Sequence, residues 1–287
     1  MVASLPDISI RQLEYLVAVA DGPTWAAAAE RVGVSPSALS QGLAELERRV
    51  GVELFERDGR RRHVRRAARP VLDHARQVVA LTGDLVAWSE RVRGAATGSV
   101  RVGMIDVAAV VHFPDALGSF RAERPGVDLH LTVAPSRGLL DQLRIGGLDL
   151  VVCVEPVAAV PGVLTEVLMS ESLVVIAPAA TTIGEPERWG PWVLFPEGSH
   201  TRSQVETHLR ELGAPVVLAA ESHQPDVLAH MVGLGLGWTV LPPVQVPAGL
   251  AVTFGPELLR RRLVAAWREG AVRDPAVDEL LSRLRAA

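Results

Sequence analysis

The sequence predicts a multi-domain α+β protein with a winged helix-turn-helix head, a long linker helix and a two-lobed α/β body. Three observations support this prediction. Residues 23–55 fit two helices joined by a tight corner, and an Arg-rich hairpin follows them. A helical repeat of apolar residues then runs without interruption from Ala67 to about Arg93. From residue 99 onward, strands and helices alternate as in an open, mostly parallel sheet.

Residues with clear capping chemistry mark the helix ends of the head. The first helix is expected to start near Ser9, and Gly33 ends the second helix in the left-handed conformation that favours glycine. Ser35 can cap the third helix, and Pro36 takes its first position, where the missing N–H does no harm. Gly51 then stops the third helix.

The exposed start of the third helix carries small polar side chains that suit base reading. A helix in the DNA major groove contacts base edges with residues near its N-terminal end. Glutamine pairs with adenine through two hydrogen bonds, and serine tolerates several bases. The residues expected at this contact are Ser35, Pro36, Ser37, Ser40 and Gln41. The alternative is that these are only solvated polar positions.

The hairpin predicts a cationic wing beside the third helix. Residues 52–55 and 63–66 flank a turn at Asp58-Gly59. Within residues 57–69, seven Arg accompany a single Asp, although the whole chain has a net charge of −4. A basic stripe on an acidic protein favours phosphate contacts. The residues expected to make them are Arg57, Arg60, Arg61, Arg62, Arg65 and Arg66.

The composition excludes several kinds of chemistry. The 287 residues include no Lys, so there is neither a Schiff-base lysine nor a Walker-type phosphate loop. The single cysteine, Cys153, cannot form an internal disulfide, which is typical of a cytoplasmic protein. No zinc-spaced ligand set and no nucleophile–base motif occurs, so we expect no catalytic residue, metal or cofactor. Residues 227–256 are uncharged but broken by Gly and Pro, and we expect no membrane partner.

The linker helix has a narrow apolar seam, which predicts pairing with the same helix of a second subunit. The alternative is a single helix packed on its own domain. Residues 94–98 are small and uncharged, as in a hinge. The predicted domains are a winged head over residues 1–66, a linker and dimerisation helix over 67–93, a hinge over 94–98, a first lobe over 99–157 with the return of 269–287, and a second lobe over 158–268.

Several elements of the body are predicted from local patterns. Apolar runs predict strands that include Leu173–Ala177 and Leu263–Trp267. A helix is expected over Ser203–Leu212. Glycines recur from Gly233 to Gly237, but they follow a helix and precede a strand, the reverse of a dinucleotide-binding turn.

These features together resemble the LysR-type transcriptional regulators over essentially the whole chain. The most specific match is the run from Leu46 to Arg57, and residues 98–103 and 233–242 continue it in the body. The resemblance implies a sequence-specific DNA-binding regulator of double-stranded promoter DNA. It also implies a periplasmic-binding-protein-like domain that responds to a small-molecule effector, and self-association into a dimer and usually a tetramer.

Three positions depart from the family pattern. Pro36-Ser37 stands where the family commonly has Gln-Pro, so one base-reading amide is missing. Arg65 replaces the Thr that would cap the linker helix. Gly42 lies inside the third helix at a cost of about 1 kcal/mol relative to Ala, for which the sequence offers no reason.

The resemblance also implies an effector site between the two lobes. The matching positions are Ile105, Asp106, Ser136, Arg137, Thr201, Arg202 and Gln224. Thr201, ahead of the predicted helix, offers a hydroxyl and free N–H groups to an anion. Asp106 would repel a carboxylate, so a zwitterion, a cation or a neutral molecule is open beside a simple acid.

Two other functions stay open at this point. One is a DNA-binding regulator that has no physiological ligand. The other is a small-molecule enzyme with an N-terminal dimerisation head, although the sequence contains no nucleophile–base pair to support it.

Overall fold

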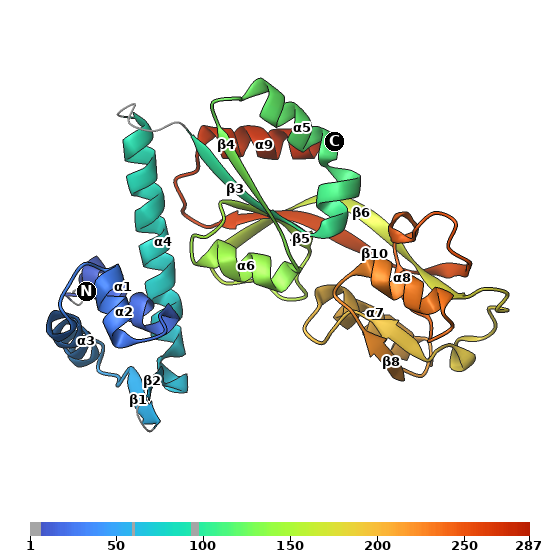
Figure 1. The fold of residues 1–287 in the computed structure, drawn as a ribbon, viewed down its shortest axis with the longest axis horizontal. Coiled ribbons are helices and arrows are strands. Elements are labelled where there is room, and N and C mark those ends of the chain that lie inside the picture. The colour runs from blue at the N-terminus through green and yellow to red at the C-terminus, as the bar shows by residue number, and fades with distance from the viewer. Residues whose placement is uncertain (1–6, 59–60, 93–97) are drawn as a thin grey trace, which may run out of the picture. The chain divides into compact units, whose positions relative to one another are not determined.

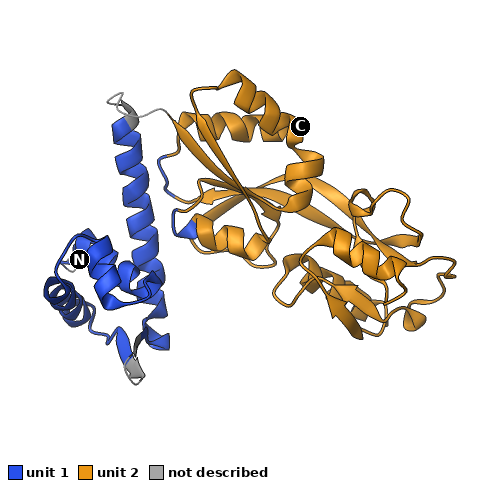
Figure 2. Ribbon diagram, viewed as in Figure 1, with its two compact units in different colours: residues 1–95, 144–146, 270–272 blue, residues 96–143, 147–269, 273–287 orange. Residues whose placement is uncertain are grey.

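The computed structural model describes residues 7–58, 61–92 and 98–287. The chain divides into two compact units (Figure 2). The first comprises Met1–Ala95, Arg144–Gly146 and Gly270–Val272, and the second comprises the rest of the chain.

The N-terminal unit packs short helices beside one end of a long helix and carries a two-stranded hairpin (Figure 1). Its apolar core joins the buried faces of the helices, with Leu16, Leu39 and Leu46 fully buried. Its elements are α1 (Ile10–Asp21), α2 (Trp25–Arg31), α3 (Pro36–Val50), β1 (Phe55–Asp58), β2 (Arg61–Val64), a 3-10 turn at Arg66–Ala68, and α4 (Arg69–Val92).

The predicted helix caps of the head are confirmed. The Ser9 hydroxyl accepts a hydrogen bond from the Gln12 N–H, and the Gln12 side chain accepts one from the Ser9 N–H, which completes a capping box. Gly33 and Gly51 have φ angles of 68° and 72°, a region in which other residues are strained. These residues mark where α1 begins and where α2 and α3 end.

Gly42 has a packing reason that the sequence did not reveal. A Cβ atom at this position would lie 2.8 Å from the ring of Tyr15 on α1. The ring therefore occupies the space that a larger residue in α3 would need. The close packing of α1 against α3 compensates for the low helix propensity of glycine, which costs about 1 kcal/mol relative to alanine.

The wing is fastened to the end of α3. The Leu54 N–H donates to Glu47 Oε1 at 2.7 Å, and the Leu54 side chain is fully buried. The predicted strands over 52–55 and 63–66 are each displaced, because residues 52–54 close off α3 and Arg66 starts the 3-10 turn. The observed strands pair Phe55 with Val64 and Asp58 with Arg61. Of the expected turn Asp58-Gly59, Asp58 lies in β1 instead, and Gly59 lies outside the described residues.

The C-terminal unit is organised around a six-stranded sheet of order β4-β3-β5-β10-β6-β9. The prediction of a mostly parallel sheet is wrong. β3 is parallel to β4 and β5, but β10 runs antiparallel to β5 and β6, and β6 antiparallel to β9. The strands are β3 (Ser99–Met104), β4 (Asp128–Val133), β5 (Leu150–Val154), β6 (Val163–Pro178), β9 (Thr239–Leu241) and β10 (Val252–Arg268).

The two long strands, β6 and β10, were predicted only in part. Leu173–Ala177 and Leu263–Trp267 are the stretches with the most continuous burial, whereas the rest of each strand alternates with exposed residues. A search for apolar runs therefore detects only these stretches. Both strands contribute to both cores, so the first lobe uses chain from both sides of the predicted division between residues 157 and 158.

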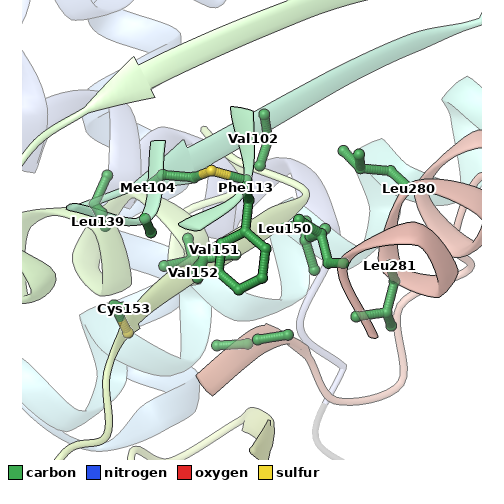
Figure 3. Packing of buried hydrophobic residues seen from close by; sticks show 14 of the residues in the cluster. Val102, Met104, Phe113, Leu139, Leu150, Val151, Val152, Cys153, Leu280 and Leu281 are labelled. Atoms are coloured by element: carbon green, nitrogen blue, oxygen red, sulfur yellow. The ribbon is translucent and has the colours of Figure 1, made fainter. Parts of the chain in front are cut away.

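Helices cover the sheet and complete two hydrophobic cores (Figure 1). In the first lobe, side chains of β3 and β5 face those of α9 around Phe113 (Figure 3). In the second lobe, Trp192 is fully buried and its ring meets that of Trp238 edge to face. The remaining elements are α5 (Pro114–Glu123), α6 (Ser136–Arg144), β7 (Trp192–Leu194), α7 (His200–Glu211), β8 (Leu218–Glu221), α8 (Pro225–Gly233) and α9 (Pro275–Ala286).

Two further features of the body bear on its function. The glycine-rich segment after α8 ends that helix, and a Cβ atom at Gly237 would lie 2.6 Å from the Pro191 carbonyl oxygen, so these glycines serve packing. Within residues 7–58, 61–92 and 98–287, no helix combines the length and the apolar character needed to cross a bilayer.

Candidate functional site

The start of α3 presents an exposed polar surface on a rigid support. Ser37, Ser40 and Gln41 are exposed, whereas the opposite face of the helix is buried at Leu39 and Leu43. Ser35 is occupied in capping, because its Oγ accepts from the Ala38 N–H at 3.2 Å and lies 2.9 Å from the Ser37 Oγ. Ser35 and Pro36 thus fix the helix start, Ser37 adds a hydrogen bond to Ser35, and Ser40 and Gln41 are free to reach outward.

Further along α3, the guanidinium groups of Arg48 and Arg49 are bound by the carboxylate of Glu45. Glu45 accepts hydrogen bonds from Arg48 and from Arg49, each at 2.5 Å. These bonds lower the pKa of Glu45 to about 2. The two arginines are therefore less available to an external phosphate than an uncommitted arginine would be.

The wing arginines differ in their surroundings. Arg65 forms an ion pair with Glu53 and lies 3.9 Å from Glu56, so its charge is already balanced. Arg66 is exposed at the start of the 3-10 turn. Arg57, Arg61 and Arg62 lie on the paired strands of the wing, and their side chains are outside the described part of the structure, as is the whole of Arg60.

A cavity of about 740 Å³ opens in the C-terminal unit. It lies where β3 and β5 end and where α6, α7 and α8 begin, the position at which open α/β sheets bind ligands. The predicted residues that line it are Ile105, Asp106, Ser136, Arg137, Thr201 and Gln224. The structure thus brings together residues that are up to 119 positions apart in sequence.

Arg202 is the predicted residue that the structure places outside this cavity. Its guanidinium forms ion pairs with Glu206, at 2.6 Å, and with Glu221, and donates to the Phe195 carbonyl. The reason is the helix start, since α7 begins at His200 with Ser199 as its cap, three residues earlier than predicted. Thr201 is therefore a buried residue of the first turn, and Arg202 points away from the cavity.

Sequence reasoning missed a buried ionic network in the cavity wall. Arg261 on β10 is 3% exposed and donates to Glu171 Oε1 on β6 at 2.7 Å. It also donates to Thr201 Oγ1 at 2.7 Å, and His112 Nε2 lies 2.9 Å from Glu171 Oε2. A signal existed in the run Arg260-Arg261-Arg262. Strand alternation turns only the middle residue inward, opposite Glu171 in the register.

Asp106 supplies a partly buried carboxyl to the same cavity. Burial raises its pKa above the ordinary value, and the nearby charge of Arg261 opposes that rise. Gln245 Nε2 donates to Asp106 Oδ2 at 3.0 Å. The other amide atom, Gln245 Oε1, is buried and has no hydrogen-bond partner among the described residues.

The single cysteine and the acidic residues do not form a reactive centre in the described ranges. Cys153 is fully buried in β5, and burial raises the pKa of its thiol to about 12. Since the thiolate is the reactive form, this thiol is inert near neutral pH. Residues 7–58, 61–92 and 98–287 contain no group of three or more His, Cys, Asp or Glu side chains placed to hold a metal.

Comparison with known families assigns a description to each unit. Residues 10–69 match the family model described as a bacterial regulatory helix-turn-helix protein of the lysR family. Residues 93–287 match the model described as the LysR substrate binding domain. The two matches together cover the winged head and the body.

Similar proteins extend over nearly the whole chain. A probable hydrogen peroxide-inducible genes activator of Streptomyces viridosporus is 32% identical and covers 97% of this chain and 94% of its own. The regulator LrrA of Synechococcus elongatus is 27% identical, with 97% of each chain covered. Among solved structures, a full-length OxyR variant from Pseudomonas aeruginosa has a TM-score of 0.69 at 25% identity, covering 96% of this chain and 94% of its own. CbnR in complex with its target DNA has a TM-score of 0.60 at 19% identity, covering 97% and 99%, and supports the fold alone.

Replacing Asp106 by Asn is expected to raise the free energy of unfolding at neutral pH. The folded-state pKa of this carboxyl is raised, so the native state binds the proton more tightly and ionisation destabilises the fold. The advantage of the variant should be fully present above the raised pKa and should shrink as the pH falls toward the ordinary value of 3.8. Urea unfolding of both proteins across this range measures it, with the exposed Asp141→Asn as the control. A variant less stable than the wild type at neutral pH would contradict the assignment.

Proposed function

The chain belongs to the LysR family of bacterial transcriptional regulators, and from this premise we propose which of its residues read DNA and which receive the signal. As a member, it is a DNA-binding regulator with a small-molecule effector domain. The members of this family are regulators and not enzymes. We extend that statement to this chain and propose that it has no catalytic activity of its own and works in the cytoplasm, where its DNA is.

We propose that the exposed start of α3 reads the DNA sequence. Ser37, Ser40 and Gln41 project from the first two turns of a helix whose other face is locked into the core. Exposed donors and acceptors near the start of a rigid helix are what base-edge recognition in the major groove requires. Ser35 and Pro36 contribute indirectly, because they fix the conformation of the helix start.

Phosphate contacts are proposed for the wing. The arginines that we propose for these contacts are Arg57, Arg60, Arg61, Arg62 and Arg66. Phosphate contacts position a protein on DNA without reading its sequence. Arg65 is given a lesser part than the sequence suggested, because Glu53 and Glu56 already balance its charge. The locally basic head on an acidic chain favours this division of roles.

Self-association is proposed through α4. This helix exposes Leu85, Val86 and Trp88 to solvent at 52%, 51% and 41% of their surfaces. Exposed apolar side chains that cluster within one turn of a long helix favour burial against a second helix. We propose that two α4 helices pair in antiparallel fashion, so that the two heads approach one DNA duplex together.

The cavity is proposed as the effector site. Its volume suits a small molecule, which favours a ligand-responsive regulator over one without a ligand. The Streptomyces relative is named for induction by hydrogen peroxide. We propose that this chain does not sense hydrogen peroxide through oxidation of its cysteine. The single thiol of this chain is buried and its pKa is about 12. We therefore propose reversible, non-covalent binding of the effector.

The DNA-reading proposal predicts two separable mutational effects on binding to the DNA upstream of the protein's own gene. Gln41→Ala should weaken binding by about 1–3 kcal/mol and relax the preference at one base position, because it removes a base-edge contact. Arg66→Ala should instead reduce the salt slope of binding by about one and leave the base preference unchanged.

Fluorescence anisotropy over a range of salt concentrations measures both effects. Arg210→Ala is the control, since this exposed arginine lies on α7 and pairs with Glu206. Variants at positions 41 and 66 that both bind like the control would exclude these residues from the DNA interface.

The pairing of α4 predicts that Leu85→Glu lowers the mass of the protein in solution. A carboxylate placed on the apolar seam would be buried without a partner, at a cost of several kcal/mol to the assembly. Sedimentation of the full chain should show at most half the mass of the wild type. Glu90→Gln, an exposed change on the same helix, should leave the mass unaltered. An unchanged mass for Leu85→Glu would show that α4 does not form the pairing surface.

A further inference from the structure

We propose that the cavity binds a small zwitterion of the amino-acid class, which carries one ammonium and one carboxylate group. This inference rests on the proposed effector site and narrows it to a class of ligand. Two chemically opposite ends of the cavity wall support it. One end offers only acceptors, and the other offers donors and positive potential.

Asp106 forms the acceptor end. Its carboxyl lines the cavity and is desolvated, and Gln245 Nε2 holds it in place by donating to Oδ2 at 3.0 Å. An ammonium group can donate to the carboxyl oxygens and supplies a countercharge in direct contact with Asp106. A carboxylate can do neither.

The first turn of α7 forms the donor end. Thr201 Oγ1 accepts a hydrogen bond from Arg261, which leaves the hydroxyl hydrogen of Thr201 free to donate. The backbone N–H groups of His200 and Thr201 are the first two of a twelve-residue helix and have no partner within it. The helix dipole adds positive potential there. These groups suit a carboxylate, and Arg261 behind Thr201 strengthens the same preference.

Neither a simple acid nor a simple amine satisfies both ends. A carboxylic acid would place a second negative charge in the cavity with Asp106. An amine would leave the α7 donors unpaired. The lining as a whole carries the carboxyls of Asp106, Asp141, Glu197 and Asp226 and the guanidinium groups of Arg137 and Arg261. Mixed charge of this kind matches a ligand that has both signs.

The rest of the wall is apolar and leaves room for a side chain. Hydrophobic lining residues come from both lobes and include Ile105, Val133, Val154 and Phe195. A cavity of about 740 Å³ exceeds what two charged groups on one carbon atom fill. The side chain of the amino acid would therefore occupy the apolar part of the cavity.

Calorimetric titration of the full-length protein tests the class of ligand. The probes are the twenty common amino acids and, for the tightest binder, the amine that lacks its carboxylate and the acid that lacks its ammonium group. We expect one or more amino acids to bind and each single-charge analogue to bind about tenfold more weakly or worse, as for a lost charged hydrogen bond. The proposal is overturned if no amino acid binds at millimolar concentration, or if either analogue binds as tightly.

If Asp106 binds the ammonium group, Asp106→Asn should reverse the preference of the protein for the amino acid over the deaminated acid. The Kd of the amino acid should rise about tenfold or more, whereas the Kd of the deaminated acid should fall because its repulsion is removed. Asp128→Asn, which neutralises an exposed carboxylate on β4 outside the cavity lining, should change neither Kd by more than about twofold. Equal weakening of both ligands by Asp106→Asn would overturn the assignment, and the unfolding transition of the variant shows whether it is folded.

The same preparations separate this inference from the function on which it rests. Binding to the upstream DNA is measured without any ligand. If the DNA binds and no amino acid does, the zwitterion proposal fails alone. If the DNA does not bind, the proposed function fails as well.

Discussion

The buried ion pair between Arg261 and Glu171 is the interaction on which the architecture of the C-terminal unit depends. The two residues face each other on β10 and β6, the long strands that serve both lobes, and both are almost wholly buried. A buried charge without a partner would destabilise the fold by several kcal/mol, so the strands are held in the register that joins them. Through Thr201 the pair also fixes the first turn of α7, and through His112 it contacts the segment before α5. The position of one wall of the cavity is therefore set by a structural ion pair.

In the head, helix caps and backbone hydrogen bonds position the side chains that we propose to read DNA. Ser35 and Pro36 define the start of α3, Gly51 ends it, and Gly42 admits the ring of Tyr15 between helices. Glu47 then connects the end of α3 to the wing through the Leu54 N–H. Since these contacts lie on the inner side of the helix, the outer residues Ser40 and Gln41 are free of structural contacts, whereas the Ser37 hydroxyl also contacts the capping Ser35. The surface proposed to contact DNA is rigid because its support is complete.

Sequence reasoning predicted what depends on local chemistry and missed what depends on pairing across the chain. The caps at Ser9 and Ser35 and the stops at Gly33 and Gly51 follow from single residues, and all are confirmed. The full length of β6 and β10 and the antiparallel half of the sheet depend on partners about 90 residues away, which no local pattern encodes. The same limit explains the cavity. Asp106 and Ser136 follow strand ends and were located, whereas Arg202 was misplaced by a three-residue error in the start of α7 and Arg261 was hidden in an arginine run. The role of Gly42 required the position of a ring on another helix.

A double-mutant cycle on Arg261 and Glu171 tests this account most directly. The four proteins are the wild type, Arg261→Met, Glu171→Met and the double variant, compared by urea unfolding of the C-terminal unit in the full chain. The account predicts that each single change costs about 3–5 kcal/mol, because it leaves a buried charge unpaired, and that the double variant is more stable than either single variant. If the two costs simply add, the residues act independently, and the pair does not hold the two lobes and the cavity wall together.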